Sequence, residues 1–303
     1  MTEPRVQDII VIGASSGGVE ALRILAAGLP PDLPAAVFAV LHVGNNPSIL
    51  PEILARSGPL PALHPRDGAP IVNGNIYVAP PDRHLLIEPG CMRLSPGPKE
   101  NRSRPAVNPL FRSAAAAYGA RVTGVILTGA LDDGAAGLAE IKRRGGIAIV
   151  QDPKTAFNPS MPANAVAQVD VDHIVPLDGI APLLSTLAST ARSALETEKP
   201  MQEEPLVKTF SGLTCPECRG PLTTERQGRI VEYRCRVGHA YAPLALAQEH
   251  QEAVERTLWA TLVALEEAAD IAERINAGPY GLSPEEIRKN RERIALIKGM
   301  LDS

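Results

Sequence analysis

The chain has 303 residues, of which 45% are hydrophobic and 3% aromatic, so one large aliphatic domain and a smaller second part are expected. Its formal net charge of −4 argues against a nucleic-acid-binding protein that works through bulk charge. No apolar run is long enough to span a membrane and the first residues form no signal peptide. We therefore expect a cytoplasmic protein without membrane insertion.

The first predicted strand covers residues 8–13, where residues 9–12 are consecutive β-branched apolar side chains. Such a run is typical of a buried parallel strand. A glycine-rich turn follows, and then a helix over 17–28. A second apolar strand over 35–41 ends at His42. In parallel α/β proteins, turns that follow strands lie at the carboxyl edge of the sheet, where functional sites form.

The following residues continue the alternation of strands and helices up to residue 192. A region rich in Pro and Gly, 44–105, carries short strands near 76–79, 85–87 and 92–94. Further helices are expected at 106–118, from the turn at 129–134 to residue 144, at 161–168 and at 178–192. Further strands are expected at 122–128, 147–150 and 173–175. This order predicts an α/β fold over residues 1–192, with a doubly wound, mostly parallel sheet in a Rossmann-like three-layer sandwich.

The remainder of the chain divides by composition. Residues 193–209 are acidic and contain prolines, which indicates a linker. A small Cys/His unit over 210–243 precedes a helical hairpin over 244–303. Its first helix, 244–276, places Val254, Leu258, Leu265 and Ala272 on one predicted apolar face. A capping box with Pro284 at the first helical position starts its second helix.

The turn after the first strand could hold a phosphate or present a nucleophile. Its glycines, Gly13, Gly17 and Gly18, do not follow the G-x-G-x-x-G spacing of a dinucleotide site. Such a site also wants an acidic residue after the second strand, which here ends in His42. The turn instead offers Ser15. The combination favours nucleophilic chemistry over phosphate binding.

A serine triad is the chemistry that these strand ends suggest. Ser15 would attack an acyl carbon, His42 would take its proton, and an aspartate would orient the imidazole. The helix that starts at Gly17 would direct its free amides at the oxyanion. Asp132 and Asp133 both follow the strand 122–128, and spacing alone does not choose between them. No G-x-S-x-G elbow is present.

Over residues 6–190 the sequence resembles the catalytic domain of the CheB-like chemotaxis protein-glutamate methylesterases. The resemblance rests on ordered motifs at residues 12–18, 41–42, 77–84, 101–105 and 124–137. It implies that Ser15 is the nucleophile, His42 the base and Asp133 the orienting acid. It also implies hydrolysis of glutamate γ-methyl esters on chemoreceptors, with release of methanol, and deamidation of receptor glutamines as a second activity.

The same resemblance implies where substrate would bind. Ser16 and Ala130, where the family usually has Met, belong to the oxyanion region, and Arg102 and Arg104 flank the crevice. Two guanidinium groups suit an acidic receptor helix. The implied partners are cytoplasmic helices of methylated chemoreceptors and other chemotaxis signalling proteins. No cofactor is implied for catalysis. Because the chain starts almost at its first strand, we expect no receiver domain.

The Cys/His unit has the spacing of a metal site. Cys215, Cys218, Cys235 and His239 form a C-x₂-C-x₁₆-C-x₃-H pattern. Three thiolates and one imidazole complete a closed tetrahedral site, which is typical of structural zinc. A unit of this size has too little core to fold without a metal. We therefore predict a zinc-ribbon-like unit, which anchors or regulates the protein in place of a receiver domain.

Two other functions fit the same sequence. A non-catalytic signalling adaptor could use the crevice and the zinc-binding tail to hold partner proteins. An esterase or amidase of other specificity could use the same triad. The presence of Ser15, His42 and Asp133 together favours an enzyme over an adaptor.

Overall fold

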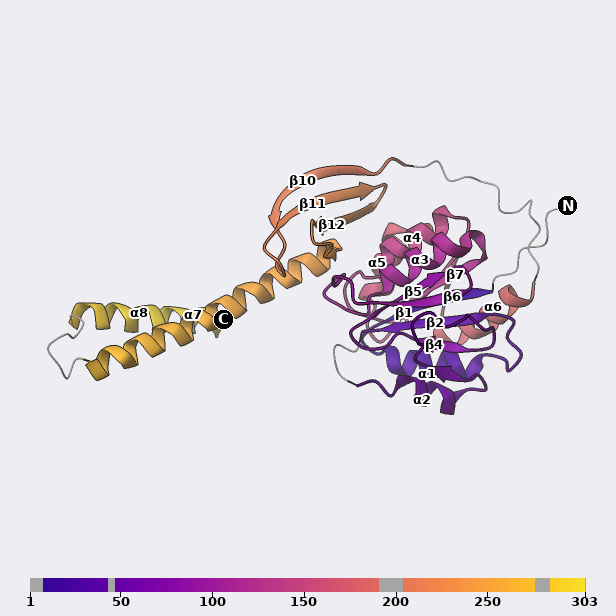
Figure 1. Ribbon diagram of the computed structural model, residues 1–303, viewed down its shortest axis with the longest axis horizontal. Coiled ribbons are helices and arrows are strands. Elements are labelled where there is room, and N and C mark those ends of the chain that lie inside the picture. Colours follow the sequence, from indigo (N-terminus) through magenta and orange to yellow (C-terminus); the bar gives the residue numbers. More distant parts are fainter. Residues whose placement is uncertain (1–7, 43–46, 191–203, 276–283, 303) are drawn as a thin grey trace. The chain divides into compact units, whose positions relative to one another are not determined.

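The computed structural model describes residues 8–42, 47–190, 204–275 and 284–302 (Figure 1). The chain divides into two compact units, residues 1–246 and 247–303. The Cys/His unit therefore belongs to the same compact unit as the sheet, and the boundary falls inside helix α7 (Pro243–Ile275). The predicted four-part division at 192, 209 and 243 stays a prediction, and most of its linker lies outside the described residues. Within the described parts of the chain, no helix is long and apolar enough to cross a membrane.

A parallel sheet of seven strands forms the centre of the first unit. Its order is β3-β4-β2-β1-β7-β8-β9, and every neighbouring pair is parallel. The strands are β1 (Ile9–Ala14), β2 (Ala36–Leu41), β3 (Ala62–Leu63), β4 (Ile76–Val78), β7 (Val122–Ile126), β8 (Ile147–Gln151) and β9 (His173–Val175). The predicted α/β class is confirmed.

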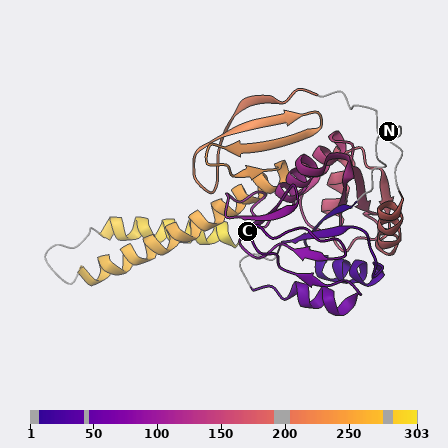
Figure 2. The ribbon, with the colours of Figure 1, turned by 45° about the vertical axis from the view of Figure 1, so that its right-hand side comes forward.

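Helices cover both faces of this sheet (Figures 1 and 2). One face carries α1 (Gly18–Gly28), α2 (Leu50–Ser57) and α6 (Leu177–Ser189). The other carries α3 (Val107–Tyr118), α4 (Ala135–Arg143), α5 (Ser160–Gln168) and the hairpin of β5 (His84–Glu88) and β6 (Cys91–Ser95). Because side chains alternate along a strand, Ile10 and Ile12 of β1 enter one core while Ile9 and Val11 enter the other.

The position of β1 creates a topological switch point. The chain leaves β1 through α1 and adds β2 on one side, whereas β7 pairs with the other side of β1. The connections at the carboxyl ends of β1 and β7 therefore depart in opposite directions and leave a crevice, the usual place for a site in such folds. Ser15, His42 and Asp133 follow β1, β2 and β7 at this edge.

Two regions contain more secondary structure than the sequence predicted. Helix α2 and strand β3 lie in the region expected to hold only short strands. Pro51 sits in the first turn of α2, where proline is tolerated, so the proline there did not exclude a helix. The Cys/His unit is a four-stranded antiparallel sheet, and no sheet was predicted there. Its strands are β10 (Val207–Thr214), β11 (Pro221–Gln227), β12 (Ile230–Cys235) and β13 (Ala240–Tyr241), and β10 starts inside the predicted linker.

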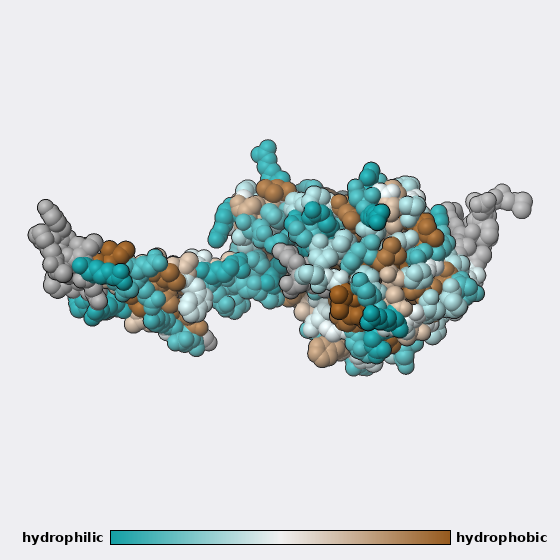
Figure 3. Space-filling view, turned by 60° about the horizontal axis from the view of Figure 1, so that its bottom comes forward, coloured by the Kyte–Doolittle hydropathy of each residue, from teal (hydrophilic) through white to brown (hydrophobic). Residues whose placement is uncertain are grey.

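The second unit contains the rest of α7 and helix α8 (Pro284–Leu301). An ion pair of 2.8 Å between Lys298 and Glu266 joins the two helices. The predicted apolar face of α7 is wrong at Val254, which is 58% exposed. Ala272 is buried as predicted, and Leu258 and Leu265 are half-buried. The other buried side chains of this part of α7 are Ala253, Leu262 and Ala269, which were not predicted. Figure 3 shows hydrophobic residues exposed among hydrophilic ones on the visible face of this unit.

Close packing of α3 against α4 gives a test of the core. A Cβ at Gly137 would lie 2.6 Å from Phe111 Cβ and 3.2 Å from Asn108 Cα. We expect Gly137→Ala to lower the free energy of unfolding by about 1–3 kcal/mol, because the helices must separate. The matched control is Gly179→Ala in α6, whose nearest neighbour would be 3.8 Å away. It should be neutral or stabilising in urea unfolding. Equal stability of the two variants would contradict this packing.

Candidate active site and metal centre

Ser15 is the first residue after β1. Its N–H donates to Thr128 O at 3.0 Å, and its carbonyl accepts from Gly18 N–H at 2.8 Å. Gly17 caps α1 with φ 77°, a left-handed conformation that glycine adopts without strain. This turn leaves Ser15 half-buried at the positive end of the α1 dipole. A hydroxyl at this place faces partial positive charge, which suits a group that generates an oxyanion.

The loop after β7 approaches Ser15 closely. A Cβ at Gly129 would lie 2.9 Å from Ser15 Cβ and 2.6 Å from Met161 Sδ, so glycine is required there. Ala130 comes next. The backbone N–H groups of Ser16 and Ala130 make no hydrogen bond to any other described residue. They are therefore available as donors beside Ser15, and their assignment to the oxyanion stays a prediction.

His42 lies between the serine and a carboxylate. Its Nδ1 is 3.3 Å from Ser15 Oγ, and its Nε2 is 2.8 Å from Asp133 Oδ2. A carboxylate only accepts hydrogen bonds, so the proton of the neutral ring belongs on Nε2. Nδ1 then presents its lone pair to the Ser15 hydroxyl, as a general base requires. A contact of 3.3 Å is on the long side, as is common in sites without substrate.

Asp133 is buried, with 2% of its surface exposed. Its Oδ2 accepts from His42 Nε2 and from Val107 N–H at 2.7 Å. Its Oδ1 accepts from Asn101 Nδ2 at 2.8 Å and from Asn108 N–H at 3.3 Å. Burial alone would raise the pKa of this carboxyl, but the hydrogen bonds and the charge of His42 outweigh it and hold the pKa below its usual range. Asp133 therefore stays ionised and fixes the imidazole.

The neighbouring aspartate points elsewhere. Asp132 Oδ2 accepts from Leu244 N–H at 3.0 Å at the start of α7, and its Oδ1 has no hydrogen-bond partner among the described residues. Burial raises the pKa of Asp132 to about 6. The structure thus brings Asp133, and not Asp132, to His42. The motif resemblance selected the same residue, whereas spacing left both open.

The two arginines expected beside the crevice differ in their surroundings. Arg104 donates to Asp82 Oδ1 at 2.6 Å and 2.9 Å and to the carbonyls of Pro96 and Gly97. These contacts stabilise the loop, so the Arg104 guanidinium has a structural role. Arg102 lies in a turn with φ 69° next to Asn101. The contact of either arginine with substrate stays a prediction.

Asn101 is a site residue that sequence reasoning missed. It lay inside a recognised motif at 101–105, yet its partner Asp133 is 32 residues away in sequence. No spacing rule links the two positions, because their contact depends on how the loop before α3 folds over the sheet edge. Only a three-dimensional structure shows it.

The four predicted metal ligands converge. Their donor atoms all lie within 4.8 Å of one another. Cys218 Sγ and Cys235 Sγ are 3.6 Å apart, and His239 Nδ1 lies 3.8 Å from Cys215 Sγ and 3.5 Å from Cys235 Sγ. Tetrahedral zinc would separate two such ligand atoms by about 3.6–3.8 Å. The donor set and its spacing therefore fit zinc.

Tight turns hold these ligands in place. Cys215 N–H donates to Gly220 O at 2.7 Å, and Arg219 N–H donates to Cys215 O at 2.8 Å. In the second turn, Gly238 N–H donates to Cys235 O at 3.0 Å, with φ 110° at Gly238. Glycine alone adopts that φ without strain. The fourth cysteine, Cys91, is half-buried on β6, away from this cluster.

The fold and the Ser15–His42–Asp133 geometry define an α/β protein with the site of a serine hydrolase. The family model described as CheB methylesterase matches residues 10–184, more than half of the chain. The chain therefore belongs to the CheB methylesterase family, as its motifs predicted. The matched region ends before the Cys/His unit begins.

Curated relatives agree with this family. The chain is 41% identical over 181 residues to "Protein-glutamate methylesterase/protein-glutamine glutaminase 2" of Anaeromyxobacter dehalogenans, which covers 59% of this chain and 53% of that protein. It thus spans about half the length of that relative. It is 38% identical over 182 residues to a protein from Leptospira interrogans whose name gives the same two activities, covering 59% of this chain and 94% of that one.

A solved structure agrees as well. The crystal structure of the Thermotoga maritima CheB methylesterase catalytic domain matches with a TM-score of 0.57 and 30% sequence identity. The match covers 62% of this chain and 100% of that one. The shared part is therefore the catalytic domain, and the rest of this chain has no counterpart in that structure.

The raised pKa of Asp132 gives a test by pH. The folded state keeps a proton up to a pKa of about 6, whereas the ordinary value is 3.8, so between these values folding binds protons. The free energy of unfolding should therefore fall as pH rises through this window, by up to about 3 kcal/mol from this group. Asp132→Asn keeps an acceptor for Leu244 N–H and removes the charge. Its stability relative to wild type should increase from about pH 4.5 to about pH 7.5 in urea unfolding. A difference that does not change with pH would contradict this assignment.

Proposed function

We propose that this protein is a protein-glutamate methylesterase of chemotaxis-type signalling. It hydrolyses the γ-methyl esters of glutamate side chains on the cytoplasmic helices of methylated chemoreceptors, and it deamidates receptor glutamines as a second activity. The observation that carries this proposal is the relay from Ser15 through His42 to the buried Asp133. The names of the curated relatives support the same reaction. The protein then works in the cytoplasm, where these receptor helices lie.

The relay accounts for both halves of the reaction. Ser15 Oγ attacks the ester carbonyl carbon while its proton passes to His42 Nδ1, and Asp133 stabilises the charged imidazole. Collapse of the tetrahedral intermediate expels methoxide, which takes the proton from His42 and leaves as methanol. Water then attacks the acyl-enzyme with His42 again as base. This step releases the glutamate carboxylate and restores Ser15. Ammonia replaces methanol in the deamidation.

The oxyanion forms at the α1 end of the crevice in this proposal. The N–H groups of Ser16 and Ala130 donate to it, and the α1 dipole adds positive potential. A backbone donor is unaffected by the presence of alanine where the family usually has Met. Arg102 attracts the acidic receptor helix, and Arg104 holds the loop that carries Arg102. Other chemotaxis signalling proteins are further proposed partners.

The Cys/His cluster holds one structural zinc ion in this proposal, and catalysis needs no cofactor. The ligands are Cys215, Cys218, Cys235 and His239. Support comes from their spacing and from the small core around them, which consists of Cys215, Leu222, Cys235, Tyr241 and Leu246. So few apolar side chains supply little folding free energy without a metal.

A complete relay favours catalysis over a non-catalytic adaptor, because an adaptor needs no base hydrogen-bonded to a buried carboxylate. An esterase or amidase of other specificity would use the same three residues. The choice of substrate therefore decides between the two enzyme functions.

Methanol release from a methylated receptor fragment tests the proposed reaction. We expect Ser15→Ala to lower kcat/KM at least about 10³-fold, because no nucleophile remains. The matched control is Ser185→Ala on α6, whose hydroxyl bonds Ala181 O within its own helix. It should keep wild-type activity. Release by Ser15→Ala, or loss in Ser16→Ala instead, would overturn the assignment of the nucleophile. Cleavage of small esters without receptor demethylation would favour the other specificity.

Metal analysis of the full chain tests the zinc proposal. The wild-type protein should contain about one zinc ion per chain, and Cys218→Ser should lose most of it because a closed site needs all four ligands. Cys91→Ser is the matched control, since Cys91 lies outside the cluster. It should keep its zinc. A wild-type protein that is folded and free of metal would contradict the proposal.

A further inference from the structure

Asn101 occupies a tight turn between the catalytic aspartate and the Cys/His unit. The turn spans residues 100–103, and Ser103 N–H donates to Glu100 O at 2.9 Å. Both central residues have positive φ, 47° at Asn101 and 69° at Arg102. This is a type I′ turn, in which asparagine is favoured at the first central position. Asn101 is 5% exposed, so its polar groups must find partners inside the protein.

Both ends of the Asn101 amide are used, and they face different parts of the protein. Nδ2 donates to Asp133 Oδ1 at 2.8 Å, and Oδ1 accepts from Ala242 N–H at 2.6 Å. The carboxylate needs a donor and the N–H needs an acceptor, so these partners fix the orientation of the amide. The Asn101 backbone N–H also donates to Ala240 O at 2.8 Å. The segment just after His239 therefore clamps the residue that holds Asp133.

We propose that Asn101 is a positioning residue through which the metal-loaded Cys/His unit orders the catalytic Asp133. His239 is a predicted ligand, and Ala240 and Ala242 follow it closely. A bound metal fixes these residues, which fix the Asn101 side chain and hence one oxygen of Asp133. Loss of the metal frees the segment and leaves Asp133 without this support. The inference rests on the proposed hydrolase function.

A second contact supports the same coupling. Asp132, the residue before Asp133, accepts from Leu244 N–H, so the chain after Ala242 holds the aspartate pair at another point. The residues that follow the metal site thus contact both neighbours in the loop after β7. The segment after His239 therefore holds Asp132 directly and Asp133 through Asn101. Simple packing of this segment on the sheet unit would not require either contact.

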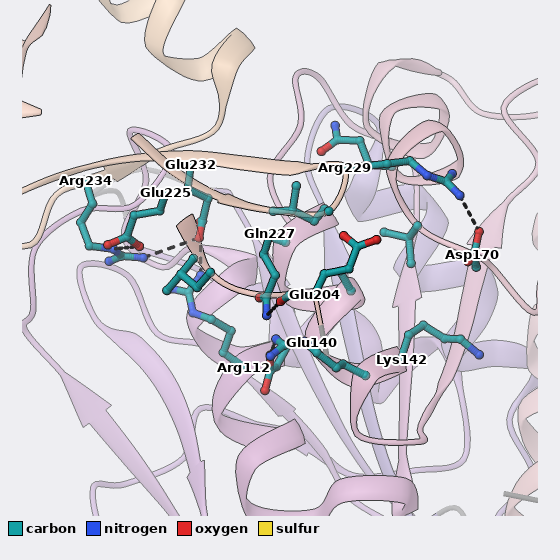
Figure 4. Close-up of a pocket in the computed structure, with 18 residues that line it drawn as sticks. Arg112, Glu140, Lys142, Asp170, Glu204, Glu225, Gln227, Arg229, Glu232 and Arg234 are labelled. Atoms are coloured by element: carbon teal, nitrogen blue, oxygen red, sulfur yellow. Dashed lines mark hydrogen bonds and ion pairs between the residues drawn. The ribbon is translucent and has the colours of Figure 1, made fainter. Parts of the chain in front are cut away.

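Charged side chains make up much of the remaining contact between the Cys/His unit and the sheet unit, beside one apolar contact from Ile230. Arg112 of α3 pairs with Glu100 and, at 3.4 Å, with Glu232 of β12. Arg229 pairs with Asp170 at 3.0 Å, with both side chains well exposed. A pocket of about 510 Å³ lies between α4 and the strands β11 and β12, and both charged side chains and apolar ones such as Ala139 and Ile230 line it (Figure 4). The exposed Arg229–Asp170 pair contributes little, whereas Arg112, Glu100 and Glu232 are largely buried. The hydrophobic clusters of the Cys/His unit and of the sheet are separate, so no large apolar core joins the two.

Covalent labelling of Ser15 by a fluorophosphonate measures the relay without a receptor. Ser15 Oγ bonds to phosphorus, fluoride leaves, and His42 accepts the proton. The variant Asn101→Asp keeps an acceptor for Ala242 N–H but cannot donate to Asp133. We expect its maximal labelling rate to fall roughly 10- to 100-fold with unchanged affinity for the reagent. The matched control is Arg229→Ala, which removes an exposed ion pair of the same contact and should label as wild type does.

Removal of the metal from the intact wild-type chain gives the second measurement. Chelation should lower the labelling rate of wild type to that of Asn101→Asp and should not slow Asn101→Asp further, with the helix content of the sheet unit preserved in circular dichroism. Equal labelling of wild type with and without metal would overturn the inference, whether or not Asn101→Asp folds. Equal labelling of folded Asn101→Asp and wild type would also overturn it. No labelling of wild-type Ser15 would instead overturn the proposed function, and the inference with it.

Discussion

The site depends on one buried carboxylate that stays ionised. Asp133 accepts four hydrogen bonds, from His42, Asn101 and the first two amides of α3. Burial disfavours its charge, and these donors together with the α3 dipole restore it. Because the carboxylate is fixed on both oxygens, the imidazole that it holds has one tautomer and one orientation. His42 can therefore act as the base for Ser15 without help from a further residue.

Sheet topology explains why these groups meet. Strand β1 lies between β2 and β7, and the chain departs from β1 and β7 in opposite directions. The loops at this edge therefore frame a crevice. The backbone segments approach one another so closely there that some positions have no room for a side chain. Gly129 has no room for a side chain beside Ser15, and Gly17 provides the left-handed turn that starts α1. These two glycines thus allow the backbone to bring the nucleophile and the free amides of α1 together.

Much of the fold and of the candidate site could be predicted from the sequence, because the patterns involved lie within short stretches of the chain. The apolar run of β1, the glycines after it and the Cys/His spacing each report on a few adjacent residues. The choice of Asp133 over Asp132 needed a family resemblance, because both follow the same strand. Asn101 could not be found, since its contacts join segments 32 and 141 residues apart. Strand β10 was hidden for another reason, because its mostly exposed side chains give no apolar pattern.

Asp133 holds the imidazole of His42 through Nε2 and leaves Nδ1 free for Ser15. Nitrogen NMR of histidine-labelled full-length protein measures this directly. We expect neutral His42 to carry its proton on Nε2, with a strongly hydrogen-bonded proton signal that disappears in Asp133→Ala. A neutral ring protonated on Nδ1, or a signal unchanged in Asp133→Ala, would contradict it.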